Sequence, residues 1–499
     1  MLSVRKVKTK SGSIAVQIVR YKGHSAQVIK HIGSAKNTDE EIALKLKAQE
    51  WISNQTGQLT LFPKSTQRVL FIDRAECISV THQFTRDFLN KCIDKCGLSD
   101  LPALLLDFAL MRLIEPASKQ RTIELLNQYF GIKYSQRFYR NIPKLLTNKE
   151  LIENKAFQLV RSEFKESFYI VLYDVTTLYF ESFKSDNLRV PGFSKDNKPQ
   201  QPQIVIGLLV TQNGFPLSYE IFSGNTFEGK TMLPIVYKFI EAHKHTNPIV
   251  VADAAMLDEE RLLELQNKDL SYIVGARLAN SSVTLIKQIQ DELKGNDKAI
   301  VRHKSKYGYL VCDFSQKRFK KDLNEFNRLL KKAEDLVAKQ STGKKATFVK
   351  KISKDVVELN VELIEKRKLL LGIKGYVTNI PGNKLSNEKV ISNYHQLWHV
   401  EQSFRMSKHD LQSRPIYHFN EKPVKAHVLI CFVALILQKY LELKTGLSLR
   451  EIRNLIWNIT ETHIQDTITK EVFTFRSPMA NINESPLTKL IKDWGGLPH

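Results

Sequence analysis

Three acidic residues have the types and the spacing that a divalent metal site requires. Asp174 ends the apolar run FYIVLYD, Asp253 ends the apolar run PIVVAD, and Glu401 follows much later in a helical pattern. If the two runs are neighbouring strands of one sheet, their carboxylates emerge side by side, and a later helix can supply the third. Taken alone, either Asp is as typical of a turn or a helix cap as it is of a metal ligand.

Carboxylate oxygens that leave open positions suit Mg²⁺ or Mn²⁺. Two such ions about 4 Å apart would activate a water or a 3′-hydroxyl and stabilise the leaving oxygen of a phosphodiester. We therefore predict that Asp174, Asp253 and Glu401 are catalytic metal ligands.

The segment around Glu401, YHQLWHVEQSFRMSK at 394–408, is predicted to form one helix. At about 100° per residue, five side chains share one stripe of this helix: Tyr394, Leu397, Glu401, Arg405 and Lys408. A core-facing stripe would be apolar, so the central carboxylate needs an explanation. The structural alternative is an ion pair between Glu401 and Arg405 on a solvated face, which would contribute only about 0.3 kcal/mol.

The composition indicates a folded protein with a polyanionic partner. Hydrophobic residues make up 42% of the chain, and 75 Lys and Arg against 52 Asp and Glu give a net charge of +23. This charge favours double-stranded DNA as the partner. The five scattered cysteines lack a CxxC pair, the N-terminus lacks a signal-peptide pattern, and the apolar run 428–437 is about half a membrane span. A cytoplasmic protein without a membrane partner is expected.

The elements that must position the carboxylates follow from the hydrophobic pattern. Strand patterns at 168–174, 203–211 and 215–223 precede a helix, the strand 248–253, and a further helix and strand. Three hairpin-linked strands followed by βαβαβ predict an α/β fold with a mixed sheet. Beyond this sheet, 315–354 holds thirteen Lys or Arg against four acids, which is typical of a solvated helix or of a surface that follows a phosphate backbone.

The 499 residues are too many for a single core. Six regions are predicted: a basic β-hairpin and helix that bind DNA (1–65), a helical domain for DNA binding or dimerisation (66–165), the first part of the catalytic core (166–280), a basic insertion domain (281–372), the second part of the core (373–445), and a C-terminal helical region for possible dimerisation (446–499).

A competing motif lies within the predicted core. GNTFEGKT at 224–231 matches the phosphate-loop pattern G-x-x-x-x-G-K-[ST], stands between a strand and a helix, and is followed by IVVAD. A P-loop NTPase that uses Lys230, Thr231 and Asp253 is therefore an alternative. Against it, the preceding strand pairs antiparallel through a hairpin, and Asp174 and Glu401 are left without roles.

Several segments together resemble a known family. The segments YDVTTLYFES, GFSKDNKPQQPQIVIGLL, GNTFEGKT, VVADAAM and YHQLWHVEQSFRMSKHDLQSRPIYH occur in the order seen in IS4-type DDE transposases, most closely in the IS1634-like branch. The family signature is Tyr, two residues, Arg, three residues, Glu, six residues, Lys. Tyr394, Glu401 and Lys408 fit it, whereas Leu397 occupies the Arg position. The phosphate contact of that Arg is therefore either lost here or taken over by Arg405, one turn beyond Glu401.

This resemblance implies an RNase H-like catalytic core with an insertion domain. It also implies a homodimer on paired terminal inverted repeats, cleavage at the element ends without ATP, and strand transfer into target DNA. Tyr394, Arg405 and Lys408 are expected to contact DNA in a prokaryotic, nucleoid-associated protein. The phosphate-loop match then becomes accidental, and a catalytically inactive DNA-binding relative is the remaining alternative.

Overall fold

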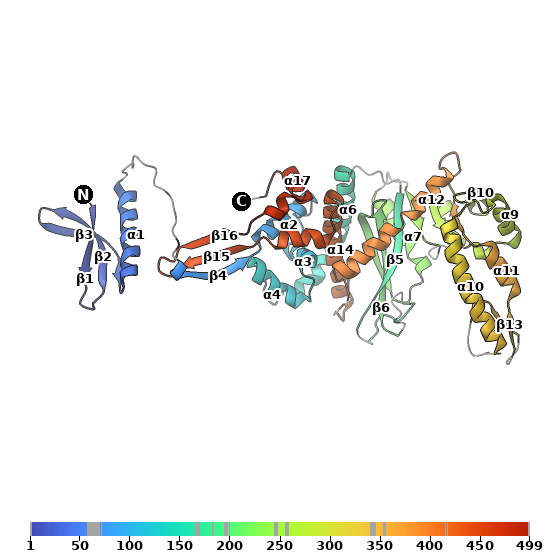
Figure 1. Cartoon of the computed structure of the whole chain (residues 1–499), viewed down its shortest axis with the longest axis horizontal. Helices are drawn as coiled ribbons and strands as arrows, with labels where there is room; N and C mark the ends of the chain where they lie inside the picture. The colour runs from blue at the N-terminus through green and yellow to red at the C-terminus, as the bar shows by residue number, and fades with distance from the viewer. Residues whose placement is uncertain are drawn as a thin grey trace. The chain divides into compact units, whose positions relative to one another are not determined.

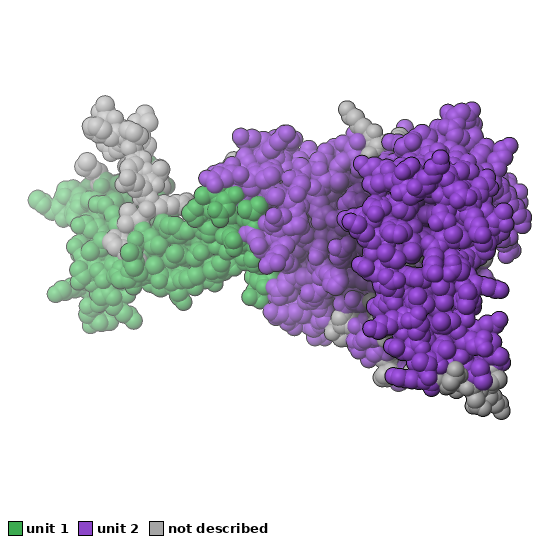
Figure 2. Space-filling model, turned by 45° about the vertical axis from the view of Figure 1, so that its right-hand side comes forward, with its two compact units in different colours: residues 1–86, 128–131, 455–481 green, residues 87–127, 132–454, 482–499 purple. Residues whose placement is uncertain are grey.

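The computed structural model describes residues 2–56, 70, 72–164, 170–181, 184–193, 198, 200–243, 248–254, 259–339, 346–352, 356–414, 416 and 418–497. Parts of the sequence segments GFSKDNKPQ, VVADAAM and RPIYH therefore lie outside the described residues. The chain divides into two compact units, residues 1–86, 128–131 and 455–481, and residues 87–127, 132–454 and 482–499, coloured separately in Figure 2.

The N-terminal part of the first unit is a small sheet with one helix. Strands β1 (Leu2–Lys8), β2 (Ile14–Lys22) and β3 (Ser25–Ala35) pair antiparallel, and helix α1 (Thr38–Thr56) follows. Val16 and Ile18 of β2 pack with Ala48 of α1 in one apolar cluster. The predicted hairpin corresponds to β2 and β3, and β1 adds a third strand.

The first unit also contains a second three-stranded sheet, in the order β16-β15-β4. Its strands are β4 (Ala75–Thr81), β15 (Glu461–Asp466) and β16 (Val472–Arg476). The regions 66–165 and 446–499 were expected to be helical, so these strands are a difference from the prediction. All three strands are short, β4 and β16 are largely exposed, and β15 (ETHIQD) is almost entirely polar, so the sequence gives only a weak strand signal here.

Helices dominate residues 83–164, most of which belong to the second unit, as the periodicity over 84–165 predicts. They are α2 (Gln83–Lys95), α3 (Ala103–Ile114), α4 (Lys119–Phe130), α5 (Phe138–Asn141), η2 (Ile142–Asn148), α6 (Lys149–Leu159) and η3 (Val160–Phe164). Helix α3 is apolar around most of its circumference, because it packs against the long helix α14 (Glu421–Thr445). Among the described helices, α14 is long and apolar enough to cross a membrane, but 94% of its most apolar window is buried inside the protein.

An eight-stranded sheet organises the rest of the second unit (Figure 1), in the order β10-β11-β14-β9-β8-β5-β6-β7. Its strands are β5 (Ile170–Tyr179), β6 (Gln203–Thr211), β7 (Pro216–Ser223), β8 (Ile249–Ala252), β9 (Tyr272–Gly275), β10 (Ile300–Ser305), β11 (Gly308–Phe314) and β14 (Ile373–Thr378).

The strand directions give a mixed sheet. Strands β5, β6 and β7 are antiparallel, whereas β8 and β9 run parallel to β5 with α7 (Met232–Ala242) and α8 (Glu259–Asn267) in the crossovers. The predicted α/β fold with a mixed sheet is confirmed. Three antiparallel strands followed by βαβαβ are consistent with an RNase H-like transposase core.

The insertion does not leave the sheet entirely. Strands β10 and β11 lie within 281–372 and extend the sheet through β14, in antiparallel pairing. The sequence pattern predicts an interrupted sheet here, because β10 is a polar, partly exposed edge strand. The other elements of the insertion are α9 (Val283–Leu293), α10 (Gln316–Ala338), β12 (Val349–Lys351), β13 (Val357–Leu359) and α11 (Val361–Leu369).

Candidate active site

The two aspartates occupy adjacent positions of neighbouring parallel strands. Strand β5 pairs with β8 in a register that places Tyr173 opposite Ala252, so the next residues along the two strands are Asp174 and Asp253. The sequence predicts this adjacency on the condition that the two strands are neighbours, and they are.

Asp174 differs from the prediction in one respect, because it does not end its strand. Strand β5 continues to Tyr179, paired with β6 alone, whereas β8 ends at Ala252. Asp174 therefore marks the point where the parallel partner stops. Since side chains alternate along a strand, Asp174 shares a face of β5 with Thr176 and Leu178.

Glu401 comes from α13 (Trp398–Arg405), which packs on β5 and β6. The single helix predicted over 394–408 is wrong. Helix α12 (Asn387–His395) ends, a tight turn at Gln396 and Leu397 follows, and α13 continues into the π-helix η6 (Met406–Asp410). Backbone bonds from the amides of Gln396 and Leu397 to the carbonyls three residues earlier tighten this turn.

The hairpin turn after β6 holds α13 in place. The hydroxyl of Ser403, a fully buried residue, donates to the carbonyl of Gly214 at 3.1 Å. Gly214 has φ +81, and a Cβ at this position would stand 3.1 Å from the Cβ of His399, so glycine serves both the turn and the close approach of the helix. Glu401 is exposed on this helix, and the described chain shows no ion pair between it and Arg405.

Tyr394 connects α12 to the second aspartate. Its hydroxyl donates to Oδ1 of Asp253 at 2.8 Å, and only 7% of the residue is exposed. Burial, and then the Asp253 carboxylate, raise the pKa of Tyr394. This contact depends on Gly275, where an added Cβ would lie 2.6 Å from the Tyr394 hydroxyl. In this structure the Tyr394 hydroxyl is bound to Asp253. The DNA contact expected of Tyr394 stays a prediction.

Lys374 on β14 is a site residue that the sequence analysis missed. Its Nζ lies 4.5 Å from the ring centroid of Tyr394. Burial and then Arg318 lower the pKa of Lys374, while Asp313, Asp253 and Glu401 act to raise it. Its charge therefore interacts with both Asp253 and Glu401. Nothing in the alternating strand sequence GIKGYVTNI distinguishes this lysine from one on a solvated face.

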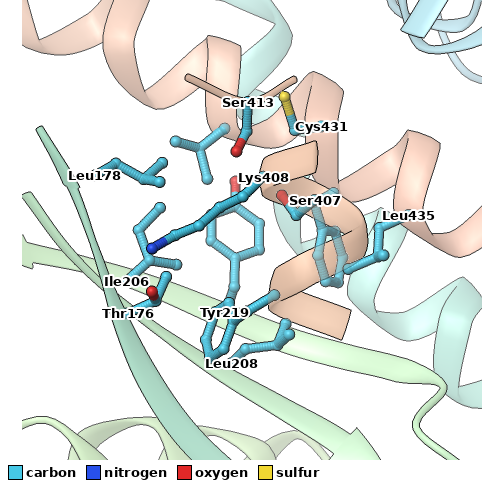
Figure 3. A pocket seen from close by; sticks show the side chains of 13 residues that line it. Thr176, Leu178, Ile206, Leu208, Tyr219, Ser407, Lys408, Ser413, Cys431 and Leu435 are labelled. Carbon is cyan, nitrogen blue, oxygen red and sulfur yellow. The ribbon is translucent and has the colours of Figure 1, made fainter. Parts of the chain in front are cut away.

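Lys408 on η6 lies on the Asp174 face of β5. It lines a small apolar cavity of about 40 Å³ together with Thr176, Leu178 and Phe404. Figure 3 shows its side chain extended across this cavity, with the amine towards Thr176. Thr176 stands two positions after Asp174, so the amine lies on the face of β5 that carries Asp174.

The two other residues of the predicted stripe diverge. Leu397, at the position of the family arginine, is buried, with 9% of the residue exposed, and forms the start of α13. Arg405 is exposed. The turn at Leu397 breaks the continuous helical stripe that the sequence predicts. The phosphate contact expected of Arg405 stays a prediction.

The donor set fits a divalent cation. Asp174, Asp253 and Glu401 offer only hard oxygen ligands, which Mg²⁺ and Mn²⁺ prefer. Among the residues that the structure describes, no group of three His, Cys, Asp or Glu side chains is already close enough to hold an ion. The strand register nevertheless sets Asp174 beside Asp253, and the helix that bears Glu401 packs on the strand of Asp174.

The structure argues against the phosphate-loop alternative. GNTFEGKT follows β7, which is an edge strand antiparallel to β6, and β6 and β5 separate it from β8. Phosphate loops instead follow a central parallel strand. Four of the motif's backbone amides already donate to protein carbonyls: Gly224 to Leu188, Thr226 to Ser223, Lys230 to Phe227 and Thr231 to Glu228.

The side chains of this motif are also unsuited to binding nucleotide. Thr231 is fully buried, donates to the Glu228 carbonyl at 2.6 Å and accepts from the Tyr173 hydroxyl at 2.8 Å. Its hydroxyl is therefore occupied within the core. Lys230 is exposed beyond the sheet edge. The match to the motif is a coincidence of sequence.

Comparison with known proteins agrees with the carboxylate geometry. A family model described as a transposase DDE domain matches residues 166–437, which is more than half of the chain. The chain therefore belongs to the transposase DDE domain family, as the sequence motifs predict.

No curated protein sequence matches the chain. The structure is similar to that of a piggyBac transposase in a synaptic complex with hairpin DNA, at 11% sequence identity and a TM-score of 0.36, covering 90% of this chain and 82% of that chain. Similarity at this level does not show a shared fold.

Proposed function

We propose that the chain is the transposase of an IS4-type insertion sequence, close to the IS1634-like branch. It would cleave DNA at the element's terminal inverted repeats and transfer the 3′ ends into target DNA as a homodimer. The observation that carries this proposal is the register between β5 and β8, which sets Asp174 beside Asp253 under the helix that bears Glu401.

The three carboxylates would hold Mg²⁺ or Mn²⁺, two ions in each site. Such ions, when bound, polarise the scissile phosphodiester and the attacking water or 3′-hydroxyl. The chain's own residues then have separate tasks. Tyr394 fixes the orientation of Asp253 through its hydroxyl. Lys374, beside Tyr394, and Lys408, beside Thr176, would contact phosphate oxygens of the DNA.

The remaining DNA contacts are assigned by charge. Arg405 is exposed one helical turn beyond Glu401, and it would contact the DNA backbone. The basic first strands and the helix α10 supply further phosphate contacts, consistent with the net charge of +23.

The test is strand cleavage of duplex DNA that carries the element's own ends, in Mg²⁺ or Mn²⁺ without nucleotide. Wild type is compared with Glu401→Gln and with the matched control Glu260→Gln, an exposed position on α8. We expect cleavage by wild type and by the control, and none by Glu401→Gln. End binding without cleavage by any of the three proteins would replace the proposal with a catalytically inactive DNA-binding relative.

A further inference from the structure

A second site lies within the second unit, in a cavity that the transposase chemistry does not use. This cavity of about 410 Å³, here called the Lys119 pocket, is lined by the end of α3, the start of α4, the segment after η6 and the start of α14. Its charged and titratable lining residues are Arg112, Lys119, Arg414, His418 and His427. No Asp or Glu is among the described residues that line it.

Neutral acceptors position the cations of the Lys119 pocket. Lys119, with 6% of the residue exposed, donates through its ammonium group to Nε2 of His418. Arg112 donates from Nη1 to the carbonyls of Leu411 at 3.3 Å and Gln412 at 3.1 Å. These contacts orient the cations without neutralising them.

The electrostatics of the pocket reflect this lack of negative charge. Burial, and then Arg112, lower the pKa of Lys119 to about 7. Burial, Lys119 and Arg112 lower the pKa of His418 to about 4. Lys119 is buried, and no acid lines the pocket beside it. Since buried charges in proteins are normally paired, an anion that enters the pocket would stabilise this lysine.

The ligand chemistry follows from the donors. Arginine and lysine donors around a cavity suit the oxygens of a phosphate group. The cavity also opens at the first residues of α4, where the positive end of the helix dipole adds to the field.

We propose that the Lys119 pocket binds a phosphate group, supplied either by the DNA backbone or by free phosphate ion. The DNA source rests on the proposed function, whereas the anion site itself does not. The pocket is distinct from the carboxylate site, since the residues that line it do not include Asp174, Asp253 or Glu401.

The first experiment is calorimetric titration of the full chain with sodium phosphate at constant ionic strength. Wild type is compared with Lys119→Met, with Arg414→Gln as a second variant in case the first does not fold, and with Lys230→Met as an exposed control. We expect wild type and Lys230→Met to bind alike, and Lys119→Met and Arg414→Gln to bind at least tenfold more weakly. Absence of binding to wild type, or equal binding to the folded pocket variants, would overturn the proposal.

The second experiment identifies the source of the phosphate. Binding of end DNA is measured over a salt series in Glu401→Gln, with and without Lys119→Met. Loss of one backbone contact lowers the slope of log affinity against log salt by about 1. If the slope is the same with and without Lys119→Met, and the chain with Lys119 binds sodium phosphate, the ligand is free phosphate and not the DNA backbone. If wild type binds sodium phosphate but does not cleave end DNA, the proposed function is rejected and the anion site remains.

Discussion

The hydroxyl of Tyr394 donates to Oδ1 of Asp253 at 2.8 Å, and the amide of Ala254 donates to the same oxygen at 2.8 Å. Two donors thereby fix one carboxylate oxygen of Asp253, on the strand next to that of Asp174. We expect Tyr394→Phe to lower end cleavage about 10- to 100-fold, because loss of a group that orients a metal ligand typically has this effect.

The measurement for Tyr394→Phe is cleavage over a range of Mn²⁺ concentrations, alongside end binding. The half-saturating Mn²⁺ concentration is expected to rise while end binding stays as in wild type. A loss of end binding at unchanged metal dependence would show instead that Tyr394 acts by contacting DNA.

Gly275 is expected to be as intolerant of substitution as Tyr394. Its added Cβ would stand 2.6 Å from the Tyr394 hydroxyl and 3.1 Å from the Cβ of Ala254, so Gly275→Ala must displace the tyrosine. We expect Gly275→Ala to reduce cleavage as Tyr394→Phe does and to lower the unfolding free energy by about 1–3 kcal/mol.

A double-mutant cycle tests this link between Gly275 and Tyr394. Since phenylalanine lacks the hydroxyl that the new Cβ meets, the two substitutions should be less destabilising together than their sum, by at least about 0.5 kcal/mol in denaturant unfolding. Additive losses would mean that the alanine clashes elsewhere, and the proposed support of Tyr394 by Gly275 would fall.

The sequence predicts those parts of the site that depend on local periodicity. Asp174 and Asp253 follow apolar runs of strand length, and a βαβ connection between strands of one sheet makes their adjacency a natural expectation. The confirmed mixed sheet rests on the same signals. These patterns identify the strand on which a residue lies, together with its face.

Other parts depend on contacts between residues distant in sequence. Lys374 lies in an ordinary alternating strand, and only the packing of β14 beside α12 brings it to Tyr394. The break at Leu397 contains neither Pro nor Gly, so helical periodicity runs through it unbroken. Strand β10 is an edge strand whose polar residues hide its pairing with β11. The sequence could not predict these features because their causes are tertiary.

The phosphate-loop match yields a prediction in which two neighbouring residues behave differently. Lys230→Ala is expected to leave end cleavage unchanged, with or without ATP, because the lysine is exposed beyond the sheet edge. Thr231→Val is expected to lower the unfolding free energy by about 1–3 kcal/mol, because it leaves the buried hydroxyl of Tyr173 without its 2.8 Å partner. Chemical denaturation and cleavage assays of both variants test this, and ATP-dependent cleavage lost in Lys230→Ala would restore the NTPase interpretation.

The Lys119 pocket predicts that removing a charge stabilises the protein. The pKa of Lys119 is about 7 in the folded chain against an ordinary value of 10.5, so between these values the unfolded chain binds more protons and wild-type stability rises with pH. Below about pH 7 the lysine is charged in both states, and its burial opposes folding in full. Arg112, Arg414, His418 and His427 face it from the other elements and supply no negative charge.

Lys119→Met keeps the side-chain length without the charge. At pH 6, in buffer free of phosphate and sulfate, we expect it to be more stable than wild type by about 1–3 kcal/mol. The difference should shrink as pH rises from 7 towards 10, while Lys230→Met follows wild type throughout. Thermal denaturation of the three proteins across this range is the measurement. A variant less stable than wild type at pH 6 would mean that the hydrogen bond from Lys119 to His418 supports the fold. The burial of charged Lys119 would then not destabilise the fold, and this would remove the thermodynamic reason for expecting an anion beside it.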